Sequence, residues 1–202
     1  MDLSAPIADL IPGHRGAVLA TLVRLHQPVT GRELAAQAHV PPATARRIID
    51  DLAKSGLVSL RPTGRSVEVS LNRQHLAVPA LVALVTLRAA LIDRLQARIR
   101  DWSEPASAAW IFGSAARADG DRQSDVDIVA VSRREPSEIW DQQIGGLVQL
   151  TRDITGNAAQ VIDYRAARFR ELVRSANPIV GSLRADGIEL VEGSDRLLKR
   201  AR

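Results

Sequence analysis

The chain has 202 residues, of which 46% are hydrophobic and 25% charged, a composition typical of a soluble globular protein with one large domain or two small ones. It contains no cysteine, which excludes disulfides, zinc–thiolate sites and thiol catalysis. The N-terminus lacks the pattern of a secretory signal, and the longest apolar run, AVPALVALVTL, is too short to span a membrane. We therefore expect a cytoplasmic protein with no membrane partner.

The formal net charge of +4 is unevenly distributed along the chain. Residues 105–202 contain 14 Lys/Arg and 14 Asp/Glu, whereas residues 1–104 contain 13 Lys/Arg and 9 Asp/Glu. The whole excess of positive charge therefore lies in the first half, which is where a nucleic-acid partner is expected to bind.

Three helices and a hairpin are predicted in the first part of the chain. Residues 14–27 carry an apolar stripe at helical spacing. A second helix begins at Thr30, because Thr30 and Glu33 have the form of a capping box. A third helix begins at Pro41-Pro42 and ends before Gly56. The strands LVSL and SVEVSL follow, joined by the turn RPTGR.

In this order of elements, Gly16–Asn72 resembles the DNA-binding domain of winged helix-turn-helix transcription regulators. The resemblance implies double-stranded DNA as partner, with the third helix in the major groove and the hairpin, or wing, on the backbone. The residues expected to contact DNA are Thr44, Arg46 and Arg47 on the third helix and Arg61 and Arg65 beside the wing tip. A solvated face or a protein-binding module is the alternative interpretation.

A long helix is predicted over residues 78–102, where leucine, isoleucine and valine recur at helical spacing. Two roles are open for it. It connects and packs on both neighbouring domains, or it forms the seam of a homodimer.

The segment WIFGSAARADGDRQSDVDIVAV carries the candidate chemistry. A short strand over 108–112 ends at Gly113-Ser114, small residues that allow backbone amides to approach a phosphate closely. Asp125 and Asp127 alternate along the next strand and so project to the same face. Two carboxylates on one face suit Mg²⁺, which binds carboxylates together with substrate phosphates. The combination indicates transfer of a nucleotidyl group.

The same segment resembles the signature of polymerase-beta-type nucleotidyltransferases. The residues in register with that signature are Gly113, Ser114, Ala116, Arg117, Ser124, Asp125 and Asp127. The resemblance implies that Gly113, Ser114, Arg117 and Ser124 bind a nucleoside triphosphate and that Asp125 and Asp127 bind Mg²⁺. The family usually has glycine after the arginine, where this chain has Ala118.

The family's third catalytic carboxylate lies on a later strand, for which the candidate is AAQVIDYR. By spacing, Gln160 occupies the position of that acid, and a glutamine cannot accept a proton from an attacking hydroxyl. Asp163 is the alternative third catalytic residue, although strand alternation turns it to the opposite face unless a bulge intervenes.

The sequence thus predicts an α+β protein of two domains. Residues 1–76 form the winged helix-turn-helix, 77–104 the connecting helix, and 105–202 a nucleotidyltransferase fold with a small mixed sheet flanked by helices. The expected function is a DNA-binding regulator whose second domain binds Mg²⁺ and a nucleoside triphosphate and transfers a nucleoside monophosphate to an acceptor hydroxyl. The alternatives are a nucleotide-sensing regulator with an inactive transferase domain and an antitoxin-like transferase that modifies a protein partner.

Overall fold

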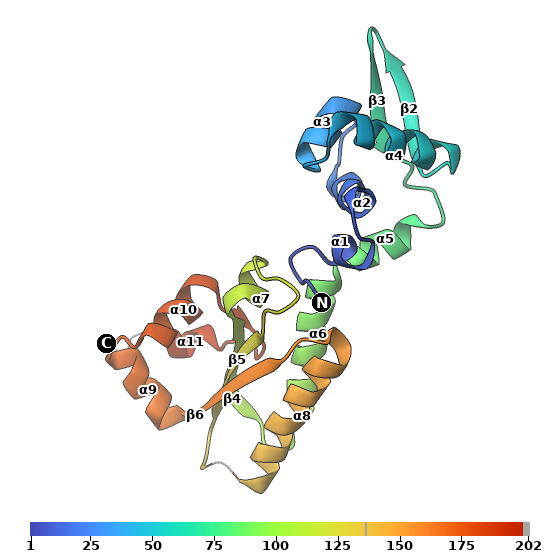
Figure 1. Ribbon diagram of the computed structural model, residues 1–202. Coiled ribbons are helices and arrows are strands. Elements are labelled where there is room, and N and C mark those ends of the chain that lie inside the picture. Colours follow the sequence, from blue (N-terminus) through green and yellow to red (C-terminus); the bar gives the residue numbers. More distant parts are fainter. Residues whose placement is uncertain (136, 200–202) are drawn as a thin grey trace. The chain divides into compact units, whose positions relative to one another are not determined.

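The computed structural model describes residues 1–135 and 137–199 and divides the chain into two compact units (Figure 1). The N-terminal unit is Ala5–Leu87, and the C-terminal unit consists of Met1–Ser4 and the chain from Arg88 onward. No helix in the described residues has the length and apolarity that crossing a membrane requires.

The N-terminal unit combines five helices in its described residues with a three-stranded antiparallel sheet of order β1-β3-β2. Its elements are α1 (Pro6–Leu10), α2 (His14–Arg24), β1 (Val29–Thr30), α3 (Gly31–Gln37), α4 (Pro42–Lys54), β2 (Val58–Thr63), β3 (Ser66–Leu71) and α5 (Val78–Val85). The capping box predicted at the start of α3 is present, since the Thr30 hydroxyl accepts a hydrogen bond from the Glu33 amide and the Glu33 carboxylate accepts one from the Thr30 amide. Buried Leu22, Leu34 and Leu52 join α2, α3 and α4 in one core.

The β2–β3 hairpin is longer than the sequence suggested. Leu60 pairs with Val69 and Pro62 pairs with Val67, so β2 continues beyond the expected strand over 57–60 and the turn contracts to Gly64 and Arg65. Proline is tolerated in β2 because this strand lies at the sheet edge, where its missing amide hydrogen costs no ladder bond.

The continuous helix expected over residues 78–102 is divided into α5 and α6 (Leu87–Arg100). The break lies at Thr86, whose hydroxyl donates to the carbonyl oxygens of Val82 at 3.1 Å and Ala83 at 3.2 Å. A threonine hydroxyl that bonds its own helix competes with the backbone ladder and favours such a break.

The C-terminal unit is built on a four-stranded mixed sheet of order β6-β5-β4-β7, in which β5 and β6 are parallel and the other pairs antiparallel. After α6 come β4 (Ala106–Phe112), α7 (Gly113–Arg117), β5 (Val126–Ser132), α8 (Glu138–Thr155), β6 (Ala159–Arg165), α9 (Ala166–Arg174), α10 (Pro178–Asp186), β7 (Ile188–Glu189) and α11 (Asp195–Leu198). The small mixed sheet flanked by helices that the sequence predicts is therefore present.

The two faces of this sheet bury alternate residues of β4 and β5. Ile111 and Ile128 pack with Trp140 against α6 and α8, whereas Trp110 and Val129 pack with Phe169 under α9 and α10. Figure 1 shows these two groups of helices on opposite sides of the sheet. The alternation fixes which side chains of β5 and β6 lie on which face, and hence which face carries the candidate site.

Candidate functional site

Gly113 and Asp127 lie side by side at the end of β4. Phe112 and Asp127 are register partners in the antiparallel β4–β5 ladder, and Gly113 follows directly. The backbone of Gly113 has φ +69°, and a Cβ atom placed there would lie 2.7 Å from Oδ2 of Asp127. A glycine is therefore required both for the left-handed turn and for the close approach to the carboxylate.

The surroundings of the Asp127 carboxyl group disfavour its ionised form. Burial raises the pKa of Asp127, and the negative charge of Asp125 raises it further, while the positive charge of Arg117 opposes both effects. Asp125 is exposed and Asp127 half-buried. A divalent cation between the two carboxylates would oppose this effect and stabilise the ionised form of Asp127.

Replacing Gly113 by alanine is expected to displace the Asp127 carboxylate and to abolish Mg²⁺–nucleotide binding. The left-handed backbone also costs a residue with a Cβ about 1–2 kcal/mol, so the midpoint of urea unfolding should fall. Gly145→Ala is the matched control, because a Cβ at Gly145 in α8 meets nothing within 4 Å. Calorimetric titration with Mg²⁺–nucleotide that finds equal affinity in both variants would contradict the role of the turn.

The loop between α7 and β5 is held by Ser124. Its hydroxyl donates to Oδ1 of Asp121 and accepts from the Asp121 amide, each at 2.9 Å. Its carbonyl oxygen accepts a hydrogen bond from Nδ2 of buried Asn157 at 2.9 Å. A Cβ at Gly120 would lie 2.9 Å from Oγ of Ser114 and 3.0 Å from Cβ of Ser124. Ser124 thus shapes the loop that brings Ser114 and the aspartates together.

Arg117 is engaged by two acids that the sequence did not single out. Its Nε donates to Asp119 at 2.8 Å, and its Nη1 donates to Asp186 at the end of α10. Hydrogen bonds to Asp119 and then Asp186 raise the pKa of Arg117. Nucleotide binding by this arginine would have to compete with both carboxylates. Ala118, where the family usually has glycine, adopts the left-handed conformation with φ +58°.

The parallel β5–β6 register places Gln160 next to Asp127. Register partners project to the same face of a sheet. Asp163 lies on the opposite face, where its Oδ2 accepts a hydrogen bond from the Trp140 indole at 3.0 Å. The structure therefore brings Gln160, rather than Asp163, to the pair of aspartates.

Among the residues that the structure describes, no group of three or more His, Cys, Asp or Glu side chains could hold a metal ion. The donor set at this end of the sheet is Asp125 and Asp127, with the neutral Gln160 beside them. Two carboxylates fit Mg²⁺ when phosphate oxygens complete the coordination. The chemistry of this donor set, two carboxylates beside a glycine turn, therefore fits a Mg²⁺–phosphate group.

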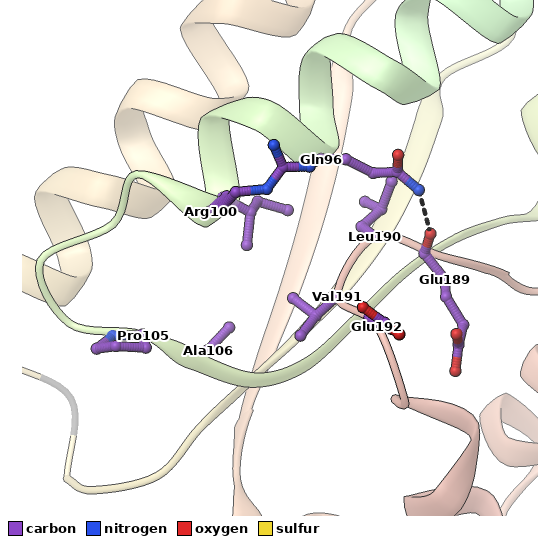
Figure 2. A pocket seen from close by; sticks show the side chains of 9 residues that line it. Gln96, Arg100, Pro105, Ala106, Glu189, Leu190, Val191 and Glu192 are labelled. Carbon is purple, nitrogen blue, oxygen red and sulfur yellow. Dashed lines mark hydrogen bonds between the residues drawn. The ribbon is translucent and has the colours of Figure 1, made fainter.

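Among the cavities lined by the described residues, only a very small void touches this pair of aspartates, through Asp125. A void of about 10 Å³ lies under the loop, lined by Leu3, Ser114, Ala115, Gly120, Asp121, Ser124, Asp125 and Asn157. A cavity of about 540 Å³ lies between α6 and the segment after β7, near the start of β4. Figure 2 shows Arg100 and Glu192 beside it and the hydrogen bond from Gln96 to the Glu189 carbonyl oxygen, 2.9 Å long. No residue of the signature lines this larger cavity.

In the N-terminal unit, α4 and the β2–β3 hairpin border a groove of about 480 Å³. It is lined by Thr30, Gly31, Arg32, Pro42, Arg46, Ile49, Asp50, Leu60, Ser66, Val67 and Val69. Arg46 and Arg47 are exposed and Thr44 is half-buried near the start of α4. Arg61 is exposed on β2, and Arg65 is exposed in the hairpin turn. Arg32, which the sequence analysis did not single out, joins Arg46 at the groove.

Residues 92–180 match the family model described as "Nucleotidyltransferase domain". No curated protein matches the chain. Two solved structures are similar to part of it. One, "Crystal structure of RV1404 from Mycobacterium tuberculosis", has 25% identity and a TM-score of 0.36, and the match covers 46% of this chain and 66% of that one. The other, "Crystal structure of the toxin-antitoxin with AMP-PNP", has 19% identity and a TM-score of 0.38, and the match covers 53% of this chain and 79% of that one.

TM-scores of this size are too low to establish a shared fold. The family match stands independently of them and includes β4, α7, β5, α8 and β6, the elements that carry Gly113, Asp127 and Gln160. It also includes Asp125, which the sequence analysis placed on a strand and which lies directly before β5. The mixed sheet with helices on both faces is consistent with the fold of that family. Residues 92–180 are therefore similar to a nucleotidyltransferase domain.

Proposed function

We propose that the C-terminal unit binds Mg²⁺ and a nucleoside triphosphate at the Gly113–Asp127 end of the sheet, in a protein whose N-terminal unit binds double-stranded DNA. The observation that carries the nucleotide site is the close approach of the Asp127 carboxylate to Gly113, where a Cβ atom would lie 2.7 Å from Oδ2. The turn at Gly113, the carboxylates of Asp125 and Asp127 and the loop residue Ser124 thus lie at one end of β4 and β5.

In this proposal Asp125 and Asp127 hold the metal ion, and Gly113 and Ser114 accommodate the phosphates. When bound, Mg²⁺ neutralises the phosphate chain and supports departure of pyrophosphate as a nucleoside monophosphate passes to an acceptor hydroxyl. The role of Arg117 is indirect, because its hydrogen bonds to Asp119 and Asp186 hold the end of α7 beside α10.

The position of Gln160 favours a second candidate, a nucleotide-sensing regulator whose transferase step is slow. Transfer requires that the acceptor hydroxyl lose a proton, and an amide cannot take it. The Asp163 carboxylate accepts a hydrogen bond from the Trp140 indole on the other face of the sheet. Nucleotide binding is then expected without efficient transfer. Modification of a protein partner remains a prediction of the sequence alone.

Thermal melting with each of the four Mg²⁺–nucleoside triphosphates tests the nucleotide site. A ligand at 100 times its Kd stabilises the folded state by about 2.7 kcal/mol, so at least one nucleotide should raise Tm by several degrees in the wild type. The same nucleotide should leave the Tm of the Asp125→Asn/Asp127→Asn double variant unchanged. An equal rise in both proteins would argue against a site at these carboxylates.

We infer that the N-terminal unit is a winged helix-turn-helix because α3, α4 and the β2–β3 hairpin follow one another in the order that this module uses. The DNA surface then consists of Thr44, Arg46 and Arg47 on α4 and Arg61 and Arg65 on the hairpin. Arg46 lines the groove between helix and hairpin, and Arg47, Arg61 and Arg65 are exposed on the same two elements. Their positive charge would attract a duplex backbone. We also propose domain limits at residues 76 and 104 and a homodimer formed through residues 77–104.

The Arg46→Ala/Arg47→Ala double variant is expected to bind DNA from the chain's own promoter region at least tenfold more weakly at low salt. If both arginines contact phosphates, the slope of log K against log salt falls by about 0.9 for each. The matched control is Arg170→Ala/Arg174→Ala, which removes the same charge from exposed positions of α9. Gel-shift titrations at several salt concentrations measure the affinity and the salt slope of each protein. Identical slopes in the wild type and both double variants would contradict the assignment of Arg46 and Arg47 to the DNA surface.

A further inference from the structure

The side chain of Arg88 joins the start of α6 to the end of α7. Its Nε donates to the carbonyl oxygen of Ala115 at 2.7 Å, and its Nη2 donates to the carbonyl oxygen of Ala116. The arginine is half-buried, and it is the first residue of the C-terminal unit after Leu87.

These two carbonyl groups lie where α7 can no longer satisfy them. The helix contains five residues, and the amides of Ala118 and Asp119 both bond to the carbonyl oxygen of Ser114. The carbonyls of the last helical turn have no partner within the helix and need an outside donor. A guanidinium group suits this task because its donors form a planar fork with a fixed charge.

We propose that Arg88 is a positioning residue for the candidate nucleotide site. It holds the C-terminal end of α7, and α7 begins with Gly113 and Ser114, so it fixes the turn against the Asp127 carboxylate. This inference rests on the proposed nucleotide function. Because a Cβ at Gly113 would already come within 2.7 Å of Asp127, a small rotation of α7 is enough to change the fit of a phosphate there.

Arg88 also makes the position of the Gly113–Ser114 turn depend on the backbone at the start of α6. The chain enters the C-terminal unit at this residue, so a change in the path of the backbone at Leu87–Arg88 moves the guanidinium group and, with it, α7. The affinity for nucleotide then depends on a residue that touches neither phosphate nor metal.

The test is calorimetric titration of the full chain with Mg²⁺ and the α,β-methylene analogue of the nucleoside triphosphate that raises the wild-type Tm most. Arg88→Ala is expected to weaken binding about tenfold, the size of a typical coupling between two positions. Arg88→Lys keeps the charge but loses the planar fork of donors, so its affinity should lie between those of the wild type and Arg88→Ala. The matched control is Arg94→Ala, which removes an exposed arginine from the same helix and should bind like the wild type.

Ethylguanidinium at millimolar concentration should restore the affinity of Arg88→Ala, which a general loss of stability would not allow. If the wild type binds the analogue and Arg88→Ala, Arg88→Lys and Arg94→Ala bind it equally well, the positioning role is wrong and the proposed nucleotide site stands. If the wild type does not bind any analogue, the proposed function fails, and the role of Arg88 fails with it.

Discussion

Replacing Asp127 by asparagine is expected to abolish Mg²⁺-dependent nucleotide binding and, at the same time, to raise the free energy of unfolding. Binding is lost because a carboxylate that would hold the metal becomes a neutral amide. Stability rises because burial and the charge of Asp125 raise the pKa of Asp127, which means that its ionised form is disfavoured in the folded state. The gain should be below about 1 kcal/mol, because the side chain is only half-buried and solvent screens its charge.

The size of this stabilising effect depends on pH. The pKa of Asp127 is raised above its value of 3.8, so the folded state binds this proton more tightly than the unfolded state does. The free-energy cost of ionising Asp127 in the folded state is therefore absent below pH 3.8, grows as pH rises through the raised pKa, and is constant above it. Urea unfolding at pH 7 and at pH 3.5 should show that Asp127→Asn stabilises the chain at neutral pH and has little effect in acid.

Asp93→Asn on the exposed side of α6 is the control for loss of one negative charge. If Asp127→Asn destabilises the chain at pH 7, or binds Mg²⁺–nucleotide like the wild type, the electrostatic description of the site is incorrect. The combination of greater stability with lost binding is the pattern of a residue retained for function at the expense of the fold.

Replacing Gln160 by aspartate is expected to create the third carboxylate of the site. The register with Asp127 puts the new carboxylate on the same face as the two aspartates. Mg²⁺ should bind more tightly, and Mg²⁺-dependent release of pyrophosphate should rise by about 10²-fold, the lower end of what a positioned general base contributes. In the absence of metal, the added like charge should lower the free energy of unfolding.

Asp163→Asn is the companion to that variant. Asp163 lies on the other face and accepts a hydrogen bond from Trp140, so its replacement should leave nucleotide affinity and pyrophosphate release unchanged. Loss of binding in Asp163→Asn, together with an inert Gln160→Asp, would reverse the assignment of the two residues.

Much of the fold follows from local patterns in the sequence. The capping box of Thr30 and Glu33, the proline at the start of α4 and the alternation around Asp125 and Asp127 each depend on neighbours within a few residues. Such patterns can be read without knowing what packs on them. The spacing argument that put Gln160 at the position of the third acid agrees with the β5–β6 register.

Other features depend on tertiary contacts and were not predictable. The hydrogen bonds from Arg88 to α7 and from Arg117 to Asp186 join residues separated by 27 and 69 positions along the chain. The break at Thr86 arises from hydroxyl bonds within an otherwise uniform apolar stretch. The helices α9 and α10, which cover the face that carries Asp127, were not assigned by the sequence analysis at all, because their apolar positions became informative only once the sheet was known.

Binding of Mg²⁺ and a nucleotide to the wild-type chain is the most direct test of the central claim. Calorimetric titration with the α,β-methylene analogues of the four nucleoside triphosphates, with Mg²⁺ and with chelator, should detect one analogue with a Kd below about 1 mM, equivalent to more than about 4 kcal/mol of binding free energy. That binding should disappear when Mg²⁺ is chelated and in Asp127→Asn. The absence of any binding, or binding that persists without the metal and without Asp127, would contradict the account.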